Sequence, residues 1–130
     1  MALAQAFLQK GCRVCITSRK QQGLDSALQL LQDQGHGEQV SGIVCELTQR
    51  EDLQRLWEHA SGFGRVDIWI NNAGLNHPRN PFHKQDPEQL SAVSAVNLTG
   101  TILATGVALN GMLEQGGGSI YHMEGFGSDG

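Results

Sequence analysis

The sequence predicts an α/β fold in which a doubly wound parallel sheet carries helices on both of its faces. Short apolar runs typical of strands alternate with longer segments whose apolar residues recur at helical spacing. The run VDIWI (66–70) is apolar apart from one aspartate, as expected for a strand that is covered on both faces. Strands and helices that alternate in this way form βαβ units, whose strands are parallel.

Each element rests on its own pattern. The helices are indicated by apolar side chains on one face and by glycines at their ends, and the strands by short runs rich in β-branched residues. The chain forms one domain, residues 1–130, without an internal repeat. In chain order, the predicted elements are a helix over 1–10, a strand over 14–17, a helix that ends near Gly35, a strand over 40–47, a helix over 48–62, a strand over 66–70, a helix over 87–114 and a strand over 119–123.

Two helices have a start signal in the sequence. Thr48 and Glu51 have the spacing of a capping box, in which each side chain bonds the backbone of the other residue. Asp86, Pro87 and Glu88 have the pattern of an N-cap, a proline at the first helical position and an acid in the first turn. Both signals predict where the helices begin.

Composition argues against several classes of protein. The formal net charge of −4 and the isoelectric point near 5.6 provide no basic surface for nucleic acid or anionic lipid. No apolar run reaches the roughly 20 residues that span a bilayer, and no signal segment stands at the start. We therefore expect an ordinary folded domain.

The cysteines and histidines form no recognisable disulfide or metal pattern. Three cysteines cannot all pair. Cys12 and Cys15 form a C-x-x-C, but no second pair completes a tetrahedral site, so we interpret them as apolar residues near a strand. None of the five histidines lies four residues from another on a helix. The sequence predicts no metal site, and His77 and His83 are interpreted as loop residues.

The strand tips are the expected place for a ligand, because ligands of open parallel sheets bind beyond the carboxyl ends of the strands. Small and polar residues at a tip let a flat ligand lie against the backbone, and asparagine amides can brace neighbouring loops. A plain turn built from helix-breaking residues is the alternative. The tips carry Ser18 and Arg19, Glu46 and Leu47, the run NNAG (71–74), and residues 123–128.

These tips resemble those of the short-chain dehydrogenase/reductase family. NNAG after VDIWI, NLTG (97–100) about one helix later and the first tip ITSR (16–19) carry the resemblance. Within the family, HMEGFGSDG (122–130) is similar to the Met-Asp-Gly-x-Gly-Ser segment of chlorophyll b reductases. The resemblance implies a Rossmann-like fold over all 130 residues. The family domain is about twice as long, so we expect its first strand and its C-terminal part to be missing here.

The resemblance implies NADPH as the cofactor. Arg19, with Ser18 beside it, falls where NADP-preferring members bind the 2′-phosphate, and a guanidinium suits a phosphate. Glu46 and Leu47 match the acid–aliphatic pair that flanks the adenine, although the acid in the family is usually aspartate.

The third strand tip and the long helix after it match further family positions. Asn71, Ala73 and Gly74 match the wall beside the adenine-side ribose, and the resemblance gives Asn71 a second role in bracing the sheet. Asn97 matches the asparagine of the catalytic tetrad, which holds a helix kink and a proton-relay water.

The catalytic serine of the family has no direct counterpart. By strand spacing it falls at about Gly125, and Ser128 is the nearest hydroxyl downstream, a pattern that the chlorophyll b reductases share. Ser128 is therefore either a hydrogen-bond donor to the substrate oxygen or a plain loop serine. The glycine-rich turn and the Tyr-x-x-x-Lys pair of the family are not in these residues, and Tyr121 cannot replace the pair because Gly125, not lysine, stands four residues later.

The implied function is an NADPH-dependent reductase that converts the formyl group of chlorophyll(ide) b to a hydroxymethyl in the chloroplast, working as an oligomer of related reductases. The alternatives are a reductase of another carbonyl, such as a 3-oxoacyl thioester, and a non-catalytic nucleotide-binding remnant. A receiver-like signalling domain would need an acidic cluster at the strand tips, where NNAG stands instead. Since the family's first strand would lie between 14–17 and 66–70, we expect residues 1–130 alone to be poorly soluble or molten and to show no NADPH-dependent reduction.

Overall fold

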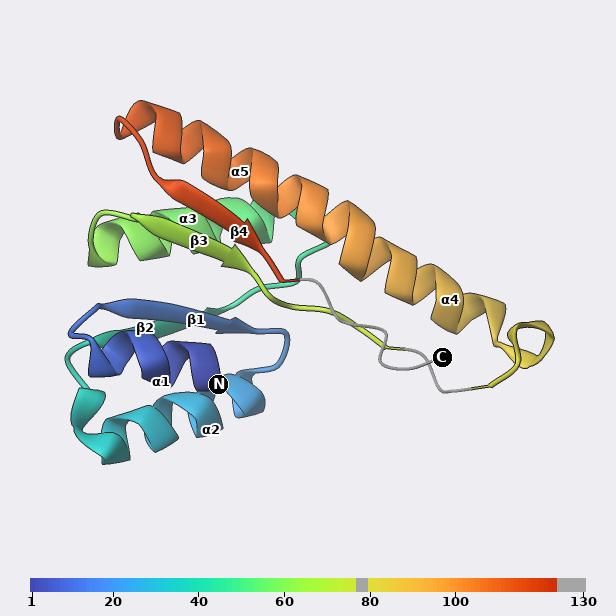
Figure 1. Ribbon diagram of the computed structural model, residues 1–130, viewed down its shortest axis with the longest axis horizontal. Coiled ribbons are helices and arrows are strands. Elements are labelled where there is room, and N and C mark those ends of the chain that lie inside the picture. Colours follow the sequence, from blue (N-terminus) through green and yellow to red (C-terminus); the bar gives the residue numbers. More distant parts are fainter. Residues whose placement is uncertain (77–79, 124–130) are drawn as a thin grey trace. The chain divides into compact units, whose positions relative to one another are not determined.

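The structure, a computed structural model, describes residues 1–76 and 80–123. The chain divides into two compact units, Met1–Val66 and Asp67–Gly130 (Figure 1). Each unit contains a two-stranded parallel sheet, β1–β2 in the first and β3–β4 in the second. The predicted α/β class with parallel strands is confirmed, with four strands in two separate pairs.

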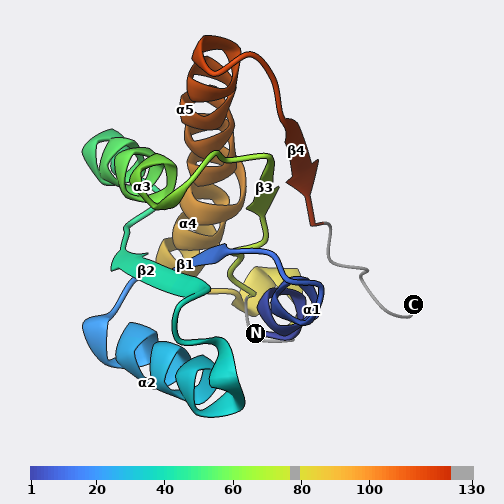
Figure 2. The same ribbon diagram turned by 90° about the vertical axis from the view of Figure 1, so that its left-hand side faces the viewer.

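The first unit is built from two βα segments and a preceding helix. β1 and β2 are parallel and in register from Val14 opposite Val40 to Ser18 opposite Val44. α1 and α2 lie on one face of this pair and α3 on the other (Figures 1 and 2). The elements are α1 Ala2–Gln9, β1 Val14–Ser18, α2 Gln21–Leu31, a π turn Gln32–His36, β2 Val40–Val44 and α3 Arg50–Phe63.

The apolar patterns of the first unit place its core where helices meet strands. Leu8, Leu31 and Val40 form a buried cluster, because the apolar face of each helix turns toward the sheet. Gly42 in β2 lets α2 approach closely, since a Cβ there would stand 2.7 Å from Leu24 Cδ1. The predicted amphipathic helices and short strands of this half of the chain are therefore confirmed.

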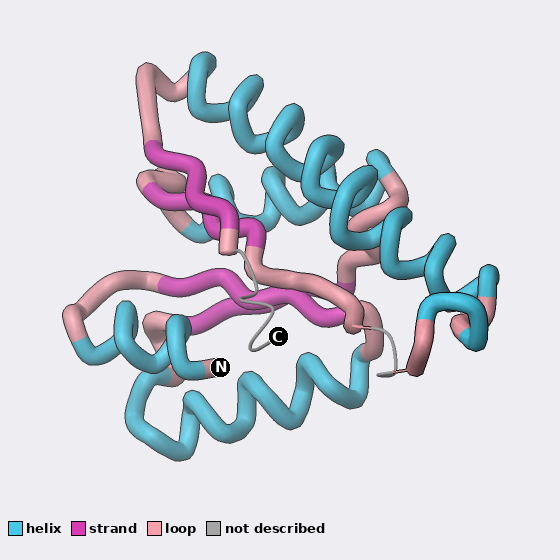
Figure 3. The backbone as a smooth tube through the Cα atoms, turned by 45° about the vertical axis from the view of Figure 1, so that its right-hand side comes forward, coloured by secondary structure: helices cyan, strands magenta, loops and turns pink. Residues whose placement is uncertain are grey.

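The second unit joins one strand pair to one long helix. β3 and β4 pair in parallel, with Ile68 opposite Ser119 and Asn71 opposite His122. Figure 3 shows the helix running without a break through a π turn. The elements are β3 Ile68–Asn71, a 3-10 turn Phe82–Lys84, α4 Pro87–Ser94, the π turn Ala95–Gly100, α5 Thr101–Glu114 and β4 Ser119–His122.

One of the two predicted helix starts is right and the other is wrong. The Asp86 side chain accepts from the Glu88 N–H at 3.0 Å, with Pro87 at the first helical position. At α3 the expected capping box does not form, because Thr48 Oγ1 donates to Glu46 Oε1 at 3.2 Å and Gln49 takes the N-cap position.

Two further expectations are corrected. Ile68 is 44% exposed, so the strand 66–70 is not covered on both faces within its unit, where α5 packs on the sheet.

By length and composition, the helix Pro87–Glu114 could cross a membrane, with a mean hydropathy of 1.6 over an 18-residue window that is 22% buried. The sequence-based expectation missed it because uncharged polar residues interrupt its apolar runs. Its buried residues include Ala104, Ala108 and Met112, and α5 contacts both strands, so we interpret it as a sheet-covering helix.

Candidate functional site

The carboxyl ends of β1 and β2 lie side by side. Ser18 and Val44 are the last residues of the pair, and the Cys45 N–H donates to the Ser18 carbonyl at 3.0 Å. Ser18 Oγ accepts from the Lys20 N–H at 3.4 Å, and Arg19 between them is exposed. The parallel pairing thus brings together the first two predicted tips, one with a guanidinium and a hydroxyl and the other with an acid and a leucine.

The second tip is tied to its own chain and to the start of α3. Glu46 Oε1 accepts from the N–H of Thr48 at 3.4 Å and from its hydroxyl at 3.2 Å. The Glu46 N–H donates to Asp52 Oδ2 at 2.9 Å, and Asp52 Oδ1 accepts from Arg55 Nη2 at 2.6 Å. Sequence reasoning missed Asp52, although an acid in the first turn of a helix is a signal for binding to backbone N–H groups. The half-buried Leu47 is left as the apolar surface of this tip.

Burial raises the thiol pKa of two cysteines in the first unit. It raises the pKa of the buried Cys45 thiol from 9.0 to about 11, with the nearby Asp52 carboxylate adding to the rise. Burial also raises the pKa of Cys15, while Cys12 is exposed. The raised pKa values keep Cys15 and Cys45 as neutral thiols at pH 7, which makes them poor nucleophiles.

We expect a thiol-alkylating reagent at pH 7 to modify Cys12 well before Cys45, as measured by mass spectrometry over time. Because the pKa of Cys45 is raised on folding, the stability that its neutral thiol contributes is fully present below pH 9 and is lost as the pH rises toward 11. In urea all three thiols should react alike. Equal rates for Cys12 and Cys45 in the folded chain would contradict this.

In the second unit, Asn97 clamps the loop that follows β3. Its Oδ1 accepts from the Leu75 N–H at 2.7 Å and its Nδ2 donates to the Leu75 carbonyl at 2.8 Å. Asn97 lies inside the π turn Ala95–Gly100, a kind of turn that is frequent at functional sites. The oxygen and the nitrogen of the amide are therefore both bonded to the backbone of Leu75, so this side chain holds the loop against the helix.

A second set of hydrogen bonds surrounds Asn71 at the end of β3. Asn71 Oδ1 accepts from Trp69 Nε1 at 2.9 Å, and Nδ2 lies 3.0 Å from Thr105 Oγ1 and 3.2 Å from His122 Nδ1. The hydroxyl of Thr105 donates in turn to the Thr101 carbonyl at 2.7 Å. Sequence reasoning foresaw a bracing role for Asn71 but missed its three partners, of which only Trp69 had a local signal, since residues i and i+2 of a strand share a face.

The exposed segment between these two anchors is Asn72–Ala73–Gly74. The structure thus brings the predicted wall residues together with Asn97, which lies 22 residues beyond Leu75 in the chain. Ser128 and His77 lie outside the described residues. Within the described ranges, no group of three or more histidine, cysteine, aspartate or glutamate side chains could hold a metal ion.

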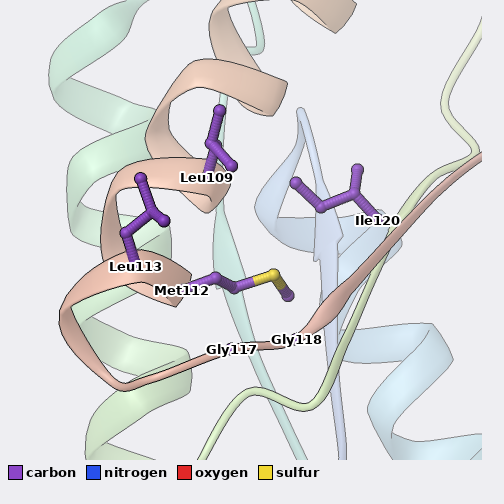
Figure 4. A pocket seen from close by; sticks show the side chains of 6 residues that line it. All are labelled: Leu109, Met112, Leu113, Gly117, Gly118 and Ile120. Carbon is purple, nitrogen blue, oxygen red and sulfur yellow. The ribbon is translucent and has the colours of Figure 1, made fainter.

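An apolar pocket of about 310 Å³ opens at the other end of the second unit's strands (Figure 4). Side chains of α5 and β4 line it near the start of β4, whereas the Asn71 network lies at the strands' carboxyl ends. It holds no ionisable side chain and has no part in the candidate site. Its lining residues are Leu109, Met112, Leu113, Gly117, Gly118 and Ile120.

Comparison with known proteins agrees with this arrangement. The family model for short chain dehydrogenases matches residues 1–124. From Arabidopsis thaliana, the chloroplastic chlorophyll(ide) b reductase NOL is 38% identical over 99% of this chain and 38% of its own length. The probable chloroplastic chlorophyll(ide) b reductase NYC1 from the same plant is 34% identical over 99% of this chain and 29% of its own.

Solved structures give the same result. A crystal structure of an actinorhodin polyketide ketoreductase variant with NADPH has a TM-score of 0.80 at 29% identity, covering 92% of this chain and 46% of that one. The chain thus spans less than half the length of each of these three proteins. With the α/β structure, the parallel strands and the family match over 124 residues, the chain belongs to the short chain dehydrogenase family.

Proposed function

We propose that the protein is an NADPH-dependent reductase that converts the formyl group of chlorophyll(ide) b to a hydroxymethyl group, and that it works in the chloroplast. The observation that carries this proposal is the identity of 38% and 34% with two chloroplastic reductases of that name over 99% of the chain. Membership of a dehydrogenase family makes the protein an oxidoreductase by resemblance, and the substrate and cofactor are the proposed refinement.

The residues of the first unit fit NADPH. Arg19 is exposed at the tip of β1, and no hydrogen bond or ion pair is recorded for its guanidinium in the described part of the chain, so it is available to a phosphate. Ser18 offers a hydroxyl beside it, while the Glu46 carboxylate is bonded to Thr48 and leaves Leu47 to flank the adenine. NADPH, when bound, supplies a hydride to the carbonyl carbon of the substrate.

In the second unit, we propose that Ala73 and Gly74 form the wall beside the adenine-side ribose and that Asn71 braces it. Asn97 shapes the long helix at its π turn by holding Leu75, which is the positioning part of its family role. Ser128 is proposed to donate a hydrogen bond to the substrate oxygen, and a homo- or hetero-oligomer of related reductases is proposed as the working form.

The test is a hybrid protein in which residues 1–130 replace the matched segment of Arabidopsis NOL. Incubated with chlorophyllide b and NADPH, the hybrid should form the hydroxymethyl product, measured by chromatography, and consume NADPH, measured by its absorbance. A hybrid that binds NADPH but reduces only a 3-oxoacyl thioester would favour the alternative substrate, which the likeness to a ketoreductase structure supports. A folded hybrid that binds no NADPH would support the non-catalytic remnant.

Gly74→Ala separates a ligand role from a folding role. The backbone of Gly74 does not have the positive φ that requires glycine, and a Cβ there would meet Asn97 Oδ1 at 3.4 Å, an ordinary contact. We therefore expect the hybrid's melting temperature to change little while its Kd for NADPH rises, because the methyl group occupies ligand space. Gly62→Ala is the matched control, because a Cβ at Gly62 in α3 meets nothing within 4 Å and lies outside the proposed wall. An unchanged Kd for Gly74→Ala would remove Gly74 from the cofactor wall.

A further inference from the structure

In the hydrogen bonds around Asn71, the chemistry of the partners fixes which group donates and which accepts. The indole N–H of Trp69 can only donate, so the atom facing it at 2.9 Å must be the amide oxygen of Asn71. The amide nitrogen then faces Thr105 Oγ1 at 3.0 Å, whose own proton goes to the Thr101 carbonyl at 2.7 Å. Each group has one role, and an amide turned by 180° would set donor against donor and break the chain of bonds.

The remaining partner, His122, is compatible with this orientation of the Asn71 amide. Asn71 Nδ2 lies 3.2 Å from His122 Nδ1, and its second hydrogen can be donated to that ring nitrogen in the tautomer in which Nδ1 accepts. Asn71 and His122 are also opposite each other in the strand pair, and the Met123 N–H donates to the Asn71 carbonyl at 2.9 Å. In that tautomer, both protons of the amide and its oxygen are in use.

These hydrogen bonds leave the Asn71 side chain with little capacity to bind a ligand. They also fix the start of the neighbouring segment, residues 72–74. Residues 72–74 are exposed, with Asn71 held before them and Leu75 held by Asn97 after them. Both anchors belong to the same long helix, since Thr105 lies in α5 and Asn97 in the π turn before it. Backbone that is held before a ligand arrives has less conformational entropy to lose on binding.

We propose that Trp69 and Thr105 are positioning residues that fix the Asn71 amide in one orientation and so preorganise residues 72–74 for the dinucleotide. This inference rests on the proposed NADPH-dependent function. Trp69 and Thr105 act through Asn71 and do not touch the cofactor. Substitution of Trp69 or Thr105 should therefore raise the Kd for NADPH and leave kcat unchanged.

Thr105→Val is the decisive variant, because it keeps the side-chain shape and removes the hydroxyl. In the NOL hybrid we expect the Kd for NADPH to rise about five-fold, the effect of one hydrogen bond, with kcat within about two-fold. Thr105→Ser keeps the hydroxyl and should restore the Kd. Thr101→Val is the matched control one turn earlier, because the network uses the carbonyl of Thr101 and not its hydroxyl. Trp69→Phe should repeat the result of Thr105→Val.

A spectroscopic measurement tests the network without cofactor. The sequence has two tryptophans, Trp57 and Trp69, and the indole N–H signal of Trp69 is assigned as the one that disappears from the spectrum of the hybrid in Trp69→Phe. We expect slow exchange of that proton, and an altered signal in Thr105→Val but not in Thr101→Val. Fast exchange with no response to Thr105→Val would overturn the network.

The outcomes are distinguishable. A hybrid that binds NADPH with a Kd that is indifferent to Thr105→Val and Trp69→Phe overturns the positioning role and leaves the proposed function standing. A hybrid that shows the protected indole proton but binds no NADPH overturns the proposed function, and with it the purpose assigned to the network. An equal fall in kcat and in affinity that Thr105→Ser does not restore would show a general structural role instead and overturn the inference.

Discussion

Asn97→Ala in the NOL hybrid is expected to lower kcat by up to about thirty-fold. The substitution removes two hydrogen bonds to Leu75, of 2.7 and 2.8 Å, and each is worth about 1 kcal/mol. If the π turn around Asn97 shapes the catalytic part of the helix, the loss appears in turnover. The Kd for NADPH should stay within a few-fold, because Asn71 still anchors the other end of the wall.

Steady-state kinetics together with NADPH titration separate these effects. Asn110→Ala is the matched control, since Asn110 is an exposed asparagine on the same helix and makes no recorded side-chain bond in the described residues. An unchanged kcat in Asn97→Ala would show that the hydrogen bonds from Asn97 to Leu75 serve only helix packing. A Kd that rises as much as kcat falls would mean that the clamp serves cofactor binding instead.

Arg19→Ala is expected to remove most of the preference for NADPH over NADH. The exposed guanidinium at the tip of β1 is the group proposed to bind the 2′-phosphate, and a hydrogen bond to a charged group is worth about 1.5–3 kcal/mol. The ratio of kcat/KM values for the two cofactors should therefore fall by about ten- to a hundred-fold. The fall should come from NADPH alone, with the NADH values unchanged.

Lys10→Ala provides the charge-matched control, because Lys10 precedes β1 and so lies at the amino end of the strand. It removes one positive charge from the same unit without touching the proposed phosphate site. A hybrid that uses both cofactors equally before any substitution would refute the assignment of Arg19. Equal losses in Arg19→Ala and Lys10→Ala would show a general effect of net charge.

Local patterns were enough to predict most of the helices and strands. The strand predicted over 14–17 is Val14–Ser18, and the helix start at Asp86 forms as expected, because both depend on residues that are close in the chain. The strand tips also follow from topology alone, since parallel pairing sets Ser18 opposite Val44.

The side-chain partners could not be predicted, because they depend on distances between elements. Thr48 had two possible partners, a backbone N–H of α3 and the Glu46 carboxylate, and only the folded geometry favours the second. The bond between Asn71 and Thr105 joins residues 34 apart in the chain. Only the family resemblance, which implies a helix kink held by Asn97, pointed to the irregular turn at Ala95–Gly100, and no local pattern of residues predicted it.

The π turn also sets the rotational phase of the long helix. A bond from i to i+5 encloses one residue more than a bond from i to i+4, and one residue corresponds to about 100° of rotation about the axis. Deleting a single residue between Ala95 and Gly100 would let the helix close as a regular α-helix, at little cost in backbone hydrogen bonds. Everything before the deletion would then turn by about a quarter of a circle relative to α5. A one-residue gap at this point in an alignment would therefore mark a relative whose Asn97 equivalent cannot reach the loop after β3.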